Sequence, residues 1–207
     1  MLSAISLTRE HASRWVCEAS HKKTREVKVN LKLYRTVDRV TEYWESWTEG
    51  TSAFIHSGRA GEKGEIQMFS MGDKQQANAM FKEVEKAENG GFKPRTFEEM
   101  AQIVIQYRLQ SWGSVEDHNR RVKIEDLLSN CLKATCMGSC DGGEIGAGAM
   151  NVFCDVVDGP AAVPIIVKEL GEHGELEGAV IAKRERTGDD DYRVVWPKDY
   201  PRAFSIF

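Results

Sequence analysis

Residues 41–69 read TEYWESWTEGTSAFIHSGRAGEKGEIQMF, and they decide the fold of the first part of the chain. Thr41–Glu49 is interpreted as a strand, whose two-residue period puts Tyr43, Glu45 and Trp47 on one face and Trp44 on the other. A tight turn is indicated at Glu49-Gly50-Thr51, and the three glycines of residues 58–64 indicate a loop. Three antiparallel strands are therefore predicted, at residues 41–49, 52–57 and 65–69.

The segments on either side extend this pattern. A strand is predicted from Arg25, because Val27, Val29, Leu31 and Leu33 alternate with polar residues. After the last strand, Asp73 is the predicted N-cap of a helix over residues 74–88. Its apolar stripe is Ala77, Met80, Phe81 and Val84. Asn89-Gly90-Gly91 is the predicted helix stop.

The second part alternates between helical and strand patterns. Thr96 and Glu99 have capping-box spacing, which predicts a helix over residues 96–110, and another helix is predicted over residues 115–132. Residues 138–148 are glycine-rich, and Gly142–Gly148 is interpreted as a strand-entry turn. The remaining predictions are a strand at 149–157, a helix at 160–172, strands at 179–185 and 192–196, and a polar hairpin turn at 187–191.

These elements predict an α+β fold with two modules, each an antiparallel sheet covered by helices. The predicted divisions are an N-terminal arm or short helix at 1–24, a sheet-and-helix domain at 25–92, a helical linker at 93–115 and an α+β domain at 116–207.

Part of the first module resembles a WGR domain. The resemblance rests on Tyr43-Trp44-Glu45, Phe54, the loop Ser57-Gly-Arg-Ala-Gly-Glu-Lys-Gly64, the helix with Ala77 and Phe81, and Gly91-Phe92. Ser57 stands where the family has the Trp of Trp-Gly-Arg. In poly(ADP-ribose) polymerases this module contacts DNA and signals to a catalytic domain. The 115 residues downstream are too few for that transferase, so the resemblance implies a binding module.

The second module resembles a bacterial ferredoxin-like module. The resemblance is carried by Cys140–Phe153, which matches a D-G-x-x-x-G-x-G-x-M strand pattern, and by Asp158 before a helix. It extends over about residues 120–207. Inhibitors of ribonuclease E are related to this module, and the resemblance implies a protein-binding, immunity or regulatory role.

A nucleic-acid or anion site is expected at the loop of the first module. An arginine donates paired hydrogen bonds to a phosphate, and glycines let backbone amides approach an anion. The candidate residues are Arg59, Lys63, Gly58, Gly61, Lys28 and Lys32. The alternative is that Arg59 pairs with a local acid and the glycines serve only a hairpin.

The charge of the two parts of the chain favours different kinds of partner. Residues 1–69 hold 11 Lys and Arg against 9 Asp and Glu, whereas residues 113–207 hold 11 against 17. A basic face suits nucleic acid or another anionic partner. An acidic second module suits the alternative, a protein partner that it recognises.

No catalytic site, metal or cofactor is expected, and the protein is interpreted as non-enzymatic. Cys131, Cys136 and Cys140 lack a close C-x2-C pair, and all five cysteines are expected to be reduced thiols. Asp141 and Glu144 are the weaker alternative, an acid/base pair. His56 is predicted to face solvent.

The chain is expected to be cytoplasmic and not to contact a membrane. No run of about 18 apolar residues is present, and residues 1–9 lack the pattern of a secretory signal.

Overall fold

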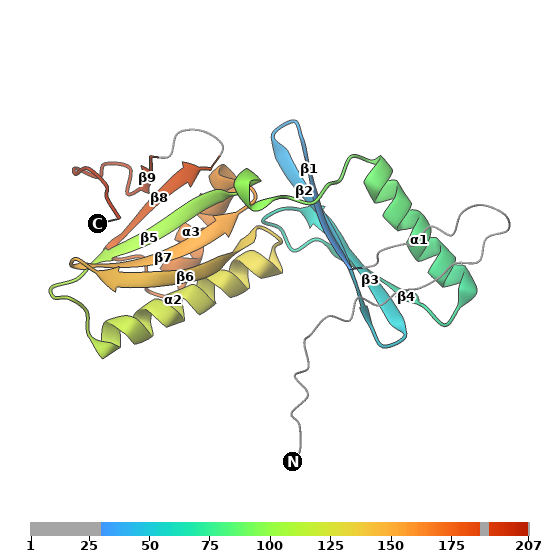
Figure 1. Cartoon of the computed structure of the whole chain (residues 1–207), viewed down its shortest axis with the longest axis horizontal. Coiled ribbons are helices and arrows are strands. Elements are labelled where there is room, and N and C mark those ends of the chain that lie inside the picture. The colour runs from blue at the N-terminus through green and yellow to red at the C-terminus, as the bar shows by residue number, and fades with distance from the viewer. Residues whose placement is uncertain (1–29, 187–190, 207) are drawn as a thin grey trace, which may run out of the picture.

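The computed structural model describes residues 30–186 and 191–206. It is an α+β structure with two antiparallel sheets and three α-helices (Figure 1). No helix in this described part of the chain is long and apolar enough to cross a membrane. Predictions for residues 1–29, including the arm, Lys28 and the start of the first strand, lie outside the described residues.

The first sheet has four strands in the order in which they occur along the chain. They are β1 Leu31–Val37, β2 Val40–Glu49, β3 Ser52–Arg59 and β4 Glu65–Ser70. The predictions for residues 41–69 are confirmed. Helix α1, Lys74–Asn89, follows β4 and begins at Asp73, whose carboxylate accepts hydrogen bonds from the backbone N–H groups of Gln75 and Gln76.

Helix α1 covers one face of this sheet. Trp44 and Ile55 on the sheet pack against Met80 and Val84 on the helix, and all four are almost fully buried. The opposite face carries Tyr43, which joins the core of the second part of the chain. The sheet is therefore covered on both sides near its middle.

The second sheet contains five strands in the order β6-β7-β5-β8-β9. Its strands are β5 Ala101–Arg108, β6 Gly138–Gly146, β7 Ala149–Val156, β8 Ala179–Glu185 and β9 Arg193–Trp196. Helix α2, Val115–Ala134, follows β5, and helix α3, Gly159–Glu172, follows β7. The predicted helices at 115–132 and 160–172 and the predicted strands at 149–157, 179–185 and 192–196 are confirmed.

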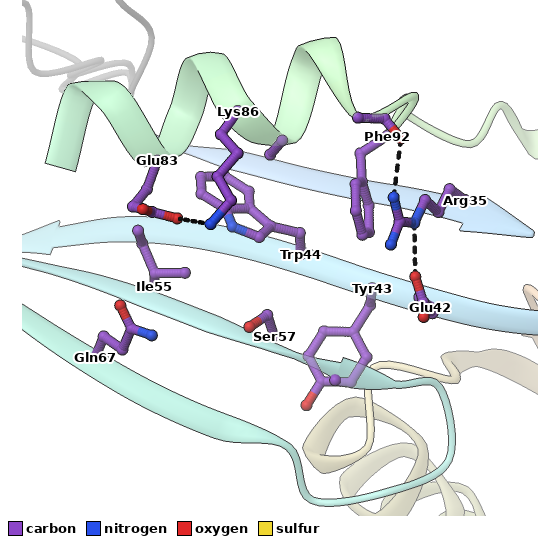
Figure 2. A pocket seen from close by; sticks show the side chains of 13 residues that line it. Arg35, Glu42, Tyr43, Trp44, Ile55, Ser57, Gln67, Glu83, Lys86 and Phe92 are labelled. Carbon is purple, nitrogen blue, oxygen red and sulfur yellow. Dashed lines mark hydrogen bonds and ion pairs between the residues drawn. The ribbon is translucent and has the colours of Figure 1, made fainter. Parts of the chain in front are cut away.

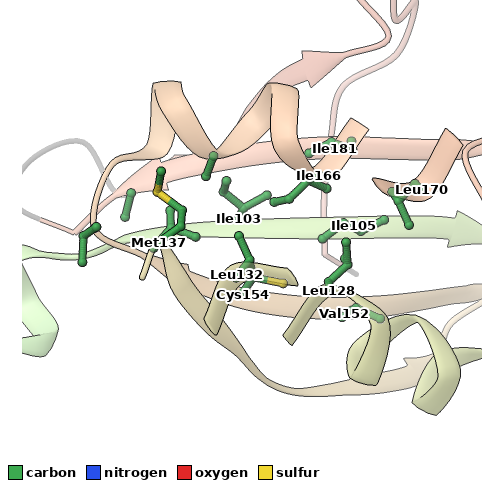
Figure 3. Close-up of a cluster of buried hydrophobic side chains, with 14 of the residues drawn as sticks. Ile103, Ile105, Leu128, Leu132, Met137, Val152, Cys154, Ile166, Leu170 and Ile181 are labelled. Atoms are coloured by element: carbon green, nitrogen blue, oxygen red, sulfur yellow. The ribbon is translucent and has the colours of Figure 1, made fainter. Parts of the chain in front are cut away.

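Both helices cover the same face of this sheet and contact each other. Ile103 and Ile105 on β5 pack beneath Leu128 of α2 and Ile166 of α3, and these four side chains are fully buried (Figure 3). At about 25 cal/mol per Å² of apolar area, burial of this kind is the main stabilising contribution to the fold.

The C-terminal segment lies against the other face. The side-chain amide of Gln106 donates to the carbonyl of Ser205, and that of Asn151 donates to the carbonyl of Ile206. Gln106 also donates to Asn151. Buried amides require such partners, since an unsatisfied polar group costs about 1–3 kcal/mol.

The prediction of a helix at residues 96–110 is wrong. The capping residues are used, because the N–H of Thr96 donates to Glu99, but they cap only the 3-10 turn Phe97–Glu99. Residues 101–108 then form β5, which pairs with both β7 and β8. The interval 93–115 therefore contains the central strand of the second sheet and not a helical linker.

Two further expectations are corrected by the second sheet. Of the strand-entry turn predicted at Gly142–Gly148, residues 142–146 belong to strand β6, and only Ala147 and Gly148 form the turn before β7. Cys140 and Cys154 face each other across β6 and β7 and form a disulfide, so the prediction that all five cysteines are reduced is wrong. The predicted hairpin at 187–191 falls largely outside the described residues.

The two sheets meet at the loop after β3. The backbone N–H of Gly61 donates to the carbonyl of Thr135 at the end of α2 (2.9 Å). The hydroxyl of Thr41 on β2 donates to Asp158 (2.9 Å), which also caps α3. These bonds join the first sheet to the ends of both helices of the second.

Candidate functional site

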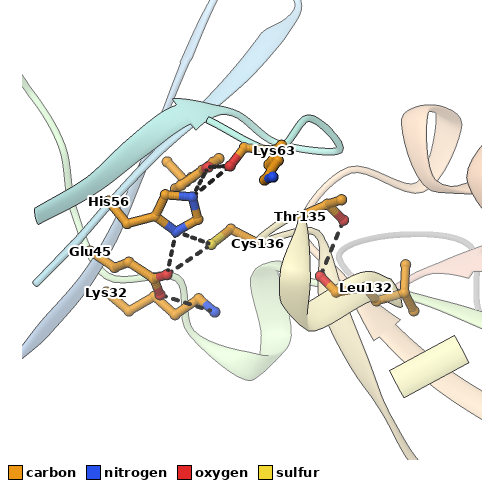
Figure 4. Close-up of polar contacts among 8 residues, drawn as sticks. Lys32, Glu45, His56, Lys63, Leu132, Thr135 and Cys136 are labelled. Atoms are coloured by element: carbon orange, nitrogen blue, oxygen red, sulfur yellow. Dashed lines mark hydrogen bonds and ion pairs between the residues drawn. The ribbon is translucent and has the colours of Figure 1, made fainter. Parts of the chain in front are cut away.

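Three side chains with chemically reactive groups meet where the two sheets touch. Glu45 comes from β2, His56 from the neighbouring strand β3, and Cys136 from the connection between α2 and β6 (Figure 4). Glu45 and His56 are directly opposite each other in the antiparallel pairing of the two strands. Side chains at such a pair of positions project from the same face, here the face away from α1.

The polar atoms of this Glu45–His56–Cys136 cluster lie within hydrogen-bond distance. Glu45 Oε1 is 2.8 Å from His56 Nδ1 and 3.2 Å from Cys136 Sγ. The Sγ atom is 3.8 Å from His56 Nδ1. Glu45 therefore accepts from both the imidazole N–H and the thiol. Its other oxygen is 3.6 Å from the ammonium group of Lys32.

The second nitrogen of His56 is held by the loop after β3. Nε2 is 2.7 Å from the carbonyl oxygen of Lys63 and 2.6 Å from the hydroxyl of Tyr43. Gly64 permits this arrangement: a Cβ there would collide with the Tyr43 hydroxyl and come 2.7 Å from the carbonyl oxygen of Ser57. The loop glycine thus lets the Lys63 carbonyl approach the imidazole.

Cys136 has an unusual backbone conformation for its residue type. Helix α2 ends in a Schellman arrangement, in which the N–H of Met137 donates to Leu132 and the N–H of Cys136 donates to Lys133. In such a motif, the residue after the C-cap adopts a left-handed conformation and is usually glycine. Here that residue is Cys136, with φ 49°. A left-handed conformation costs a residue with a Cβ about 1–2 kcal/mol.

Burial and charge set the protonation of this cluster. Burial, together with the hydrogen bond to Glu45 and its negative charge, raises the pKa of the Cys136 thiol to about 12. Burial also acts to raise the pKa of Glu45, but hydrogen bonds from His56 and Cys136 and the charge of Lys32 outweigh it, so that pKa is lowered. Cys136 is therefore a thiol and not a thiolate nucleophile, and it is fully buried.

A separate pocket of about 530 Å³ lies on the other face of the first sheet, beneath α1 (Figure 2). Its apolar wall includes Trp44 and Phe92. Two cations lie at its edge. The guanidinium of Arg35 bonds Glu42 (2.6 Å) and lies over the Phe92 ring, and Lys86 lies 3.4 Å from Glu83. The remaining polar groups that line the pocket include Ser57 and Gln67.

The residues predicted to bind an anion do not converge on one point. Arg59 is exposed and lies 3.5 Å from Glu62, so it has the local acidic partner that the alternative interpretation names. Lys32 is paired with Glu45. Lys63 contributes its backbone carbonyl to His56, while its side chain is exposed.

The loop glycines are used for packing. A Cβ on Gly58 would come 2.8 Å from Gly64, and one on Gly61 would come 2.8 Å from Ile165. The suggested acid/base pair is not assembled either, because Glu144 accepts from Asn151 while Asp141 is exposed.

The sequence did not identify the Glu45–His56–Cys136 cluster. The prediction that His56 faces solvent is wrong, since it is 8% exposed. One signal was available: strand alternation put Tyr43 and Glu45 on one face. Cys136 lies 91 residues beyond Glu45, and only the packing of the two sheets brings them together.

Comparison of the chain with protein-family models, with curated protein sequences and with solved structures finds no match.

Proposed function

We propose that this chain is a non-enzymatic binding protein, built of a WGR-like module and a ferredoxin-like module, and that it binds an anionic ligand in the pocket beneath α1. The four-stranded sheet with one covering helix supports the first assignment. The order strand–helix–strand–strand–helix–strand, with β6-β7-β5-β8 as neighbours, supports the second.

The observation that carries the proposal is Ser57. It stands where the WGR pattern has tryptophan, it lies directly opposite Trp44 in the β2–β3 pairing, and it lines the pocket. A small side chain at this point leaves open a space that an indole group would reduce. The pocket has the size typical of small-molecule sites, about 300–1,000 Å³.

An anion with an apolar ring suits the pocket where it takes the place of a carboxylate, Glu42 or Glu83, that pairs with a lining cation. Lys86 forms an exposed ion pair with Glu83, and such pairs contribute about 0–1 kcal/mol. A ligand phosphate or carboxylate therefore displaces Glu83 at little cost. Trp44 and Phe92 supply the apolar contact. A nucleotide unit has this combination of groups.

The experiment measures binding of a fluorescein-labelled single-stranded oligonucleotide by anisotropy at low and moderate salt. Ser57→Trp reduces the pocket, and Lys86→Gln removes one cation. Lys86→Gln is expected to weaken binding by about twofold to fivefold, the effect of one exposed ion pair. Ser57→Trp is expected to weaken it more, because the indole fills space that the ligand would occupy. Lys86→Gln is also expected to reduce the salt dependence by about one unit of slope.

Arg59→Gln is the matched control, because it removes an exposed arginine of the loop outside the pocket. It is expected to leave affinity unchanged. A loss of binding in Arg59→Gln alone would move the anion site to the loop. Absence of binding by the wild-type protein at low salt would reject the proposal and favour a protein partner.

A further inference from the structure

We propose that Glu45, His56 and Cys136 form a binding site for Zn²⁺, with water as the fourth ligand. Thiolate, imidazole and carboxylate are the three zinc ligands that proteins use most, and an open site with three protein ligands and one water is a common arrangement. This proposal is independent of the ligand pocket, which lies on the opposite face of the first sheet.

The spacing of the three ligand atoms fits a tetrahedral ion. Zinc bonds of about 2.3 Å to sulfur and about 2.0 Å to nitrogen and oxygen put ligand atoms about 3.3–3.5 Å apart. The observed separations are 2.8 Å between Glu45 and His56, 3.2 Å between Glu45 and Cys136, and 3.8 Å between His56 and Cys136. Shifts of about half an ångström bring all three into range.

The surroundings of His56 match those of a metal-ligating histidine. Such a residue usually donates its other ring N–H to a carbonyl or carboxylate, which fixes the tautomer and orients the ring. The Lys63 carbonyl oxygen, 2.7 Å from Nε2, is in the position of this acceptor, and the Tyr43 hydroxyl lies beside it. The nitrogen that faces Glu45 and Cys136, Nδ1, is then the one that binds the ion in exchange for its proton.

The backbone at Cys136 is a second, independent observation. Glycine is the usual residue at this left-handed position, and cysteine adopts the conformation at a cost in free energy. Strained positions of this kind concentrate at functional sites. At this position the Cys136 sulfur lies 3.2 Å from Glu45 of the first sheet.

Binding exchanges protons for the ion. The Cys136 S–H bond breaks, its proton leaves to solvent, and the sulfur electron pair forms the bond to Zn²⁺. The His56 Nδ1–H bond, which donates to Glu45 before the ion binds, also breaks and its proton leaves to solvent, so that the Nδ1 lone pair binds Zn²⁺ while Nε2–H donates to the Lys63 carbonyl. The ion enters beside Glu45, whose side chain is 22% exposed, and it displaces the ammonium group of Lys32 from the carboxylate.

The test is a Zn²⁺ titration of chelator-stripped protein against a chromophoric chelator, with a parallel titration by Co²⁺. One Zn²⁺ per chain is expected, and the Co²⁺ protein is expected to show thiolate-to-metal absorption and the intense visible bands of tetrahedral cobalt. Cys136→Gly removes the sulfur ligand at a position that favours glycine. It is expected to weaken Zn²⁺ binding by more than about 100-fold and to abolish the thiolate band.

Cys131→Ser is the matched control, because Cys131 is the other free cysteine in the described part of the chain. It is expected to leave both readouts unchanged. Lys32→Gln removes the competing cation and is expected to tighten binding by about twofold to fivefold, the effect of one exposed ion pair. Absence of stoichiometric Zn²⁺ binding, or retention of binding and the thiolate band in Cys136→Gly, overturns the proposal.

Discussion

Cys136 occupies a backbone position whose left-handed conformation disfavours any residue with a Cβ atom. Its left-handed conformation favours glycine, while its sulfur is in contact with Glu45. The backbone strain and the contact of the sulfur can be separated by comparing two variants. Both lack the sulfur, but only one of them has a Cβ atom.

We predict that Cys136→Gly is more stable than Cys136→Ala when measured with a chelator present. Alanine keeps the left-handed strain of about 1–2 kcal/mol, which glycine relieves. The greater freedom of glycine in the unfolded chain reduces the gain, so the expected difference is about 1 kcal/mol or less. Urea unfolding of both variants measures it. An alanine variant as stable as the glycine variant would contradict the strain at this position.

Glu175 provides a test through pH. It is a buried carboxylate that accepts hydrogen bonds from Arg120 (2.9 Å) and Lys123 (2.8 Å). Burial acts to raise its pKa, but the bonds from Lys123 and Arg120 outweigh burial and lower it. A lowered pKa in the folded state means that the carboxylate stabilises the fold above its unfolded pKa of about 4.3.

We therefore predict that Glu175→Gln destabilises the protein by about 1–3 kcal/mol at pH 7. This difference from wild type shrinks as pH falls through about 4 and then through the lower pKa of the folded state. Glu177→Gln, an exposed neighbour, is the control and is expected to have little effect. Thermal unfolding of the wild type and both variants across this pH range measures the stability difference. A difference that persists unchanged at the lowest pH would mean that charge is not the source.

At the scale of elements, the sequence predicted those with clear boundaries. The strands within residues 41–69 are separated by glycine-containing turns, and α1 itself has a clear stripe and cap. Strand β5 was misjudged because it is buried on both faces, so Ile103-Val104-Ile105 gives no alternation. The capping residues before it then favoured a helix. The Glu45–His56–Cys136 cluster depends on contacts between segments that lie far apart in the sequence, and local sequence patterns do not contain such contacts.

The central position of β5 predicts a large difference between two identical substitutions. Ile105→Ala removes a fully buried side chain between α2 and α3 and is expected to cost about 2–5 kcal/mol. Ile66→Ala, on β4, removes a side chain that is 64% exposed and is expected to cost less than about 1 kcal/mol. Urea unfolding compares them. Similar losses in both variants would contradict the position of β5 inside the sheet.

At the scale of the whole molecule, the loop after β3 holds the two sheets together. Gly61 has φ 93° and fits against Ile165 and Met137 of the second part. The matched comparison is Gly91, whose φ is 85° but whose Cβ position has no neighbour within 4 Å. Alanine at either site adopts a left-handed conformation, but only alanine at position 61 collides with the other part of the chain.

We predict that Gly61→Ala is less stable than Gly91→Ala by about 1 kcal/mol or more, the usual cost of overpacking. Gly61→Ala is also expected to be cleaved faster by a protease between the two sheets, because their contact is weakened. Thermal unfolding and limited proteolysis of the two variants measure these effects. Equal stability would show that the loop does not contribute to the contact.

The hydrogen bond from the Gly61 amide to the Thr135 carbonyl also implies thermodynamic linkage. An anion that accepted a hydrogen bond from the Gly61 amide would have to replace the Thr135 carbonyl as its acceptor. Only the minor population of molecules in which the sheets are apart could therefore bind the anion at this amide. The apparent affinity would fall by the fraction of molecules in that open state. By reciprocity, such a ligand would favour separation of the sheets to the same extent. A metal ion bound by residues of β2, β3 and the end of α2 would stabilise the state in which the sheets are in contact. Such a metal ion would therefore weaken binding of the anion.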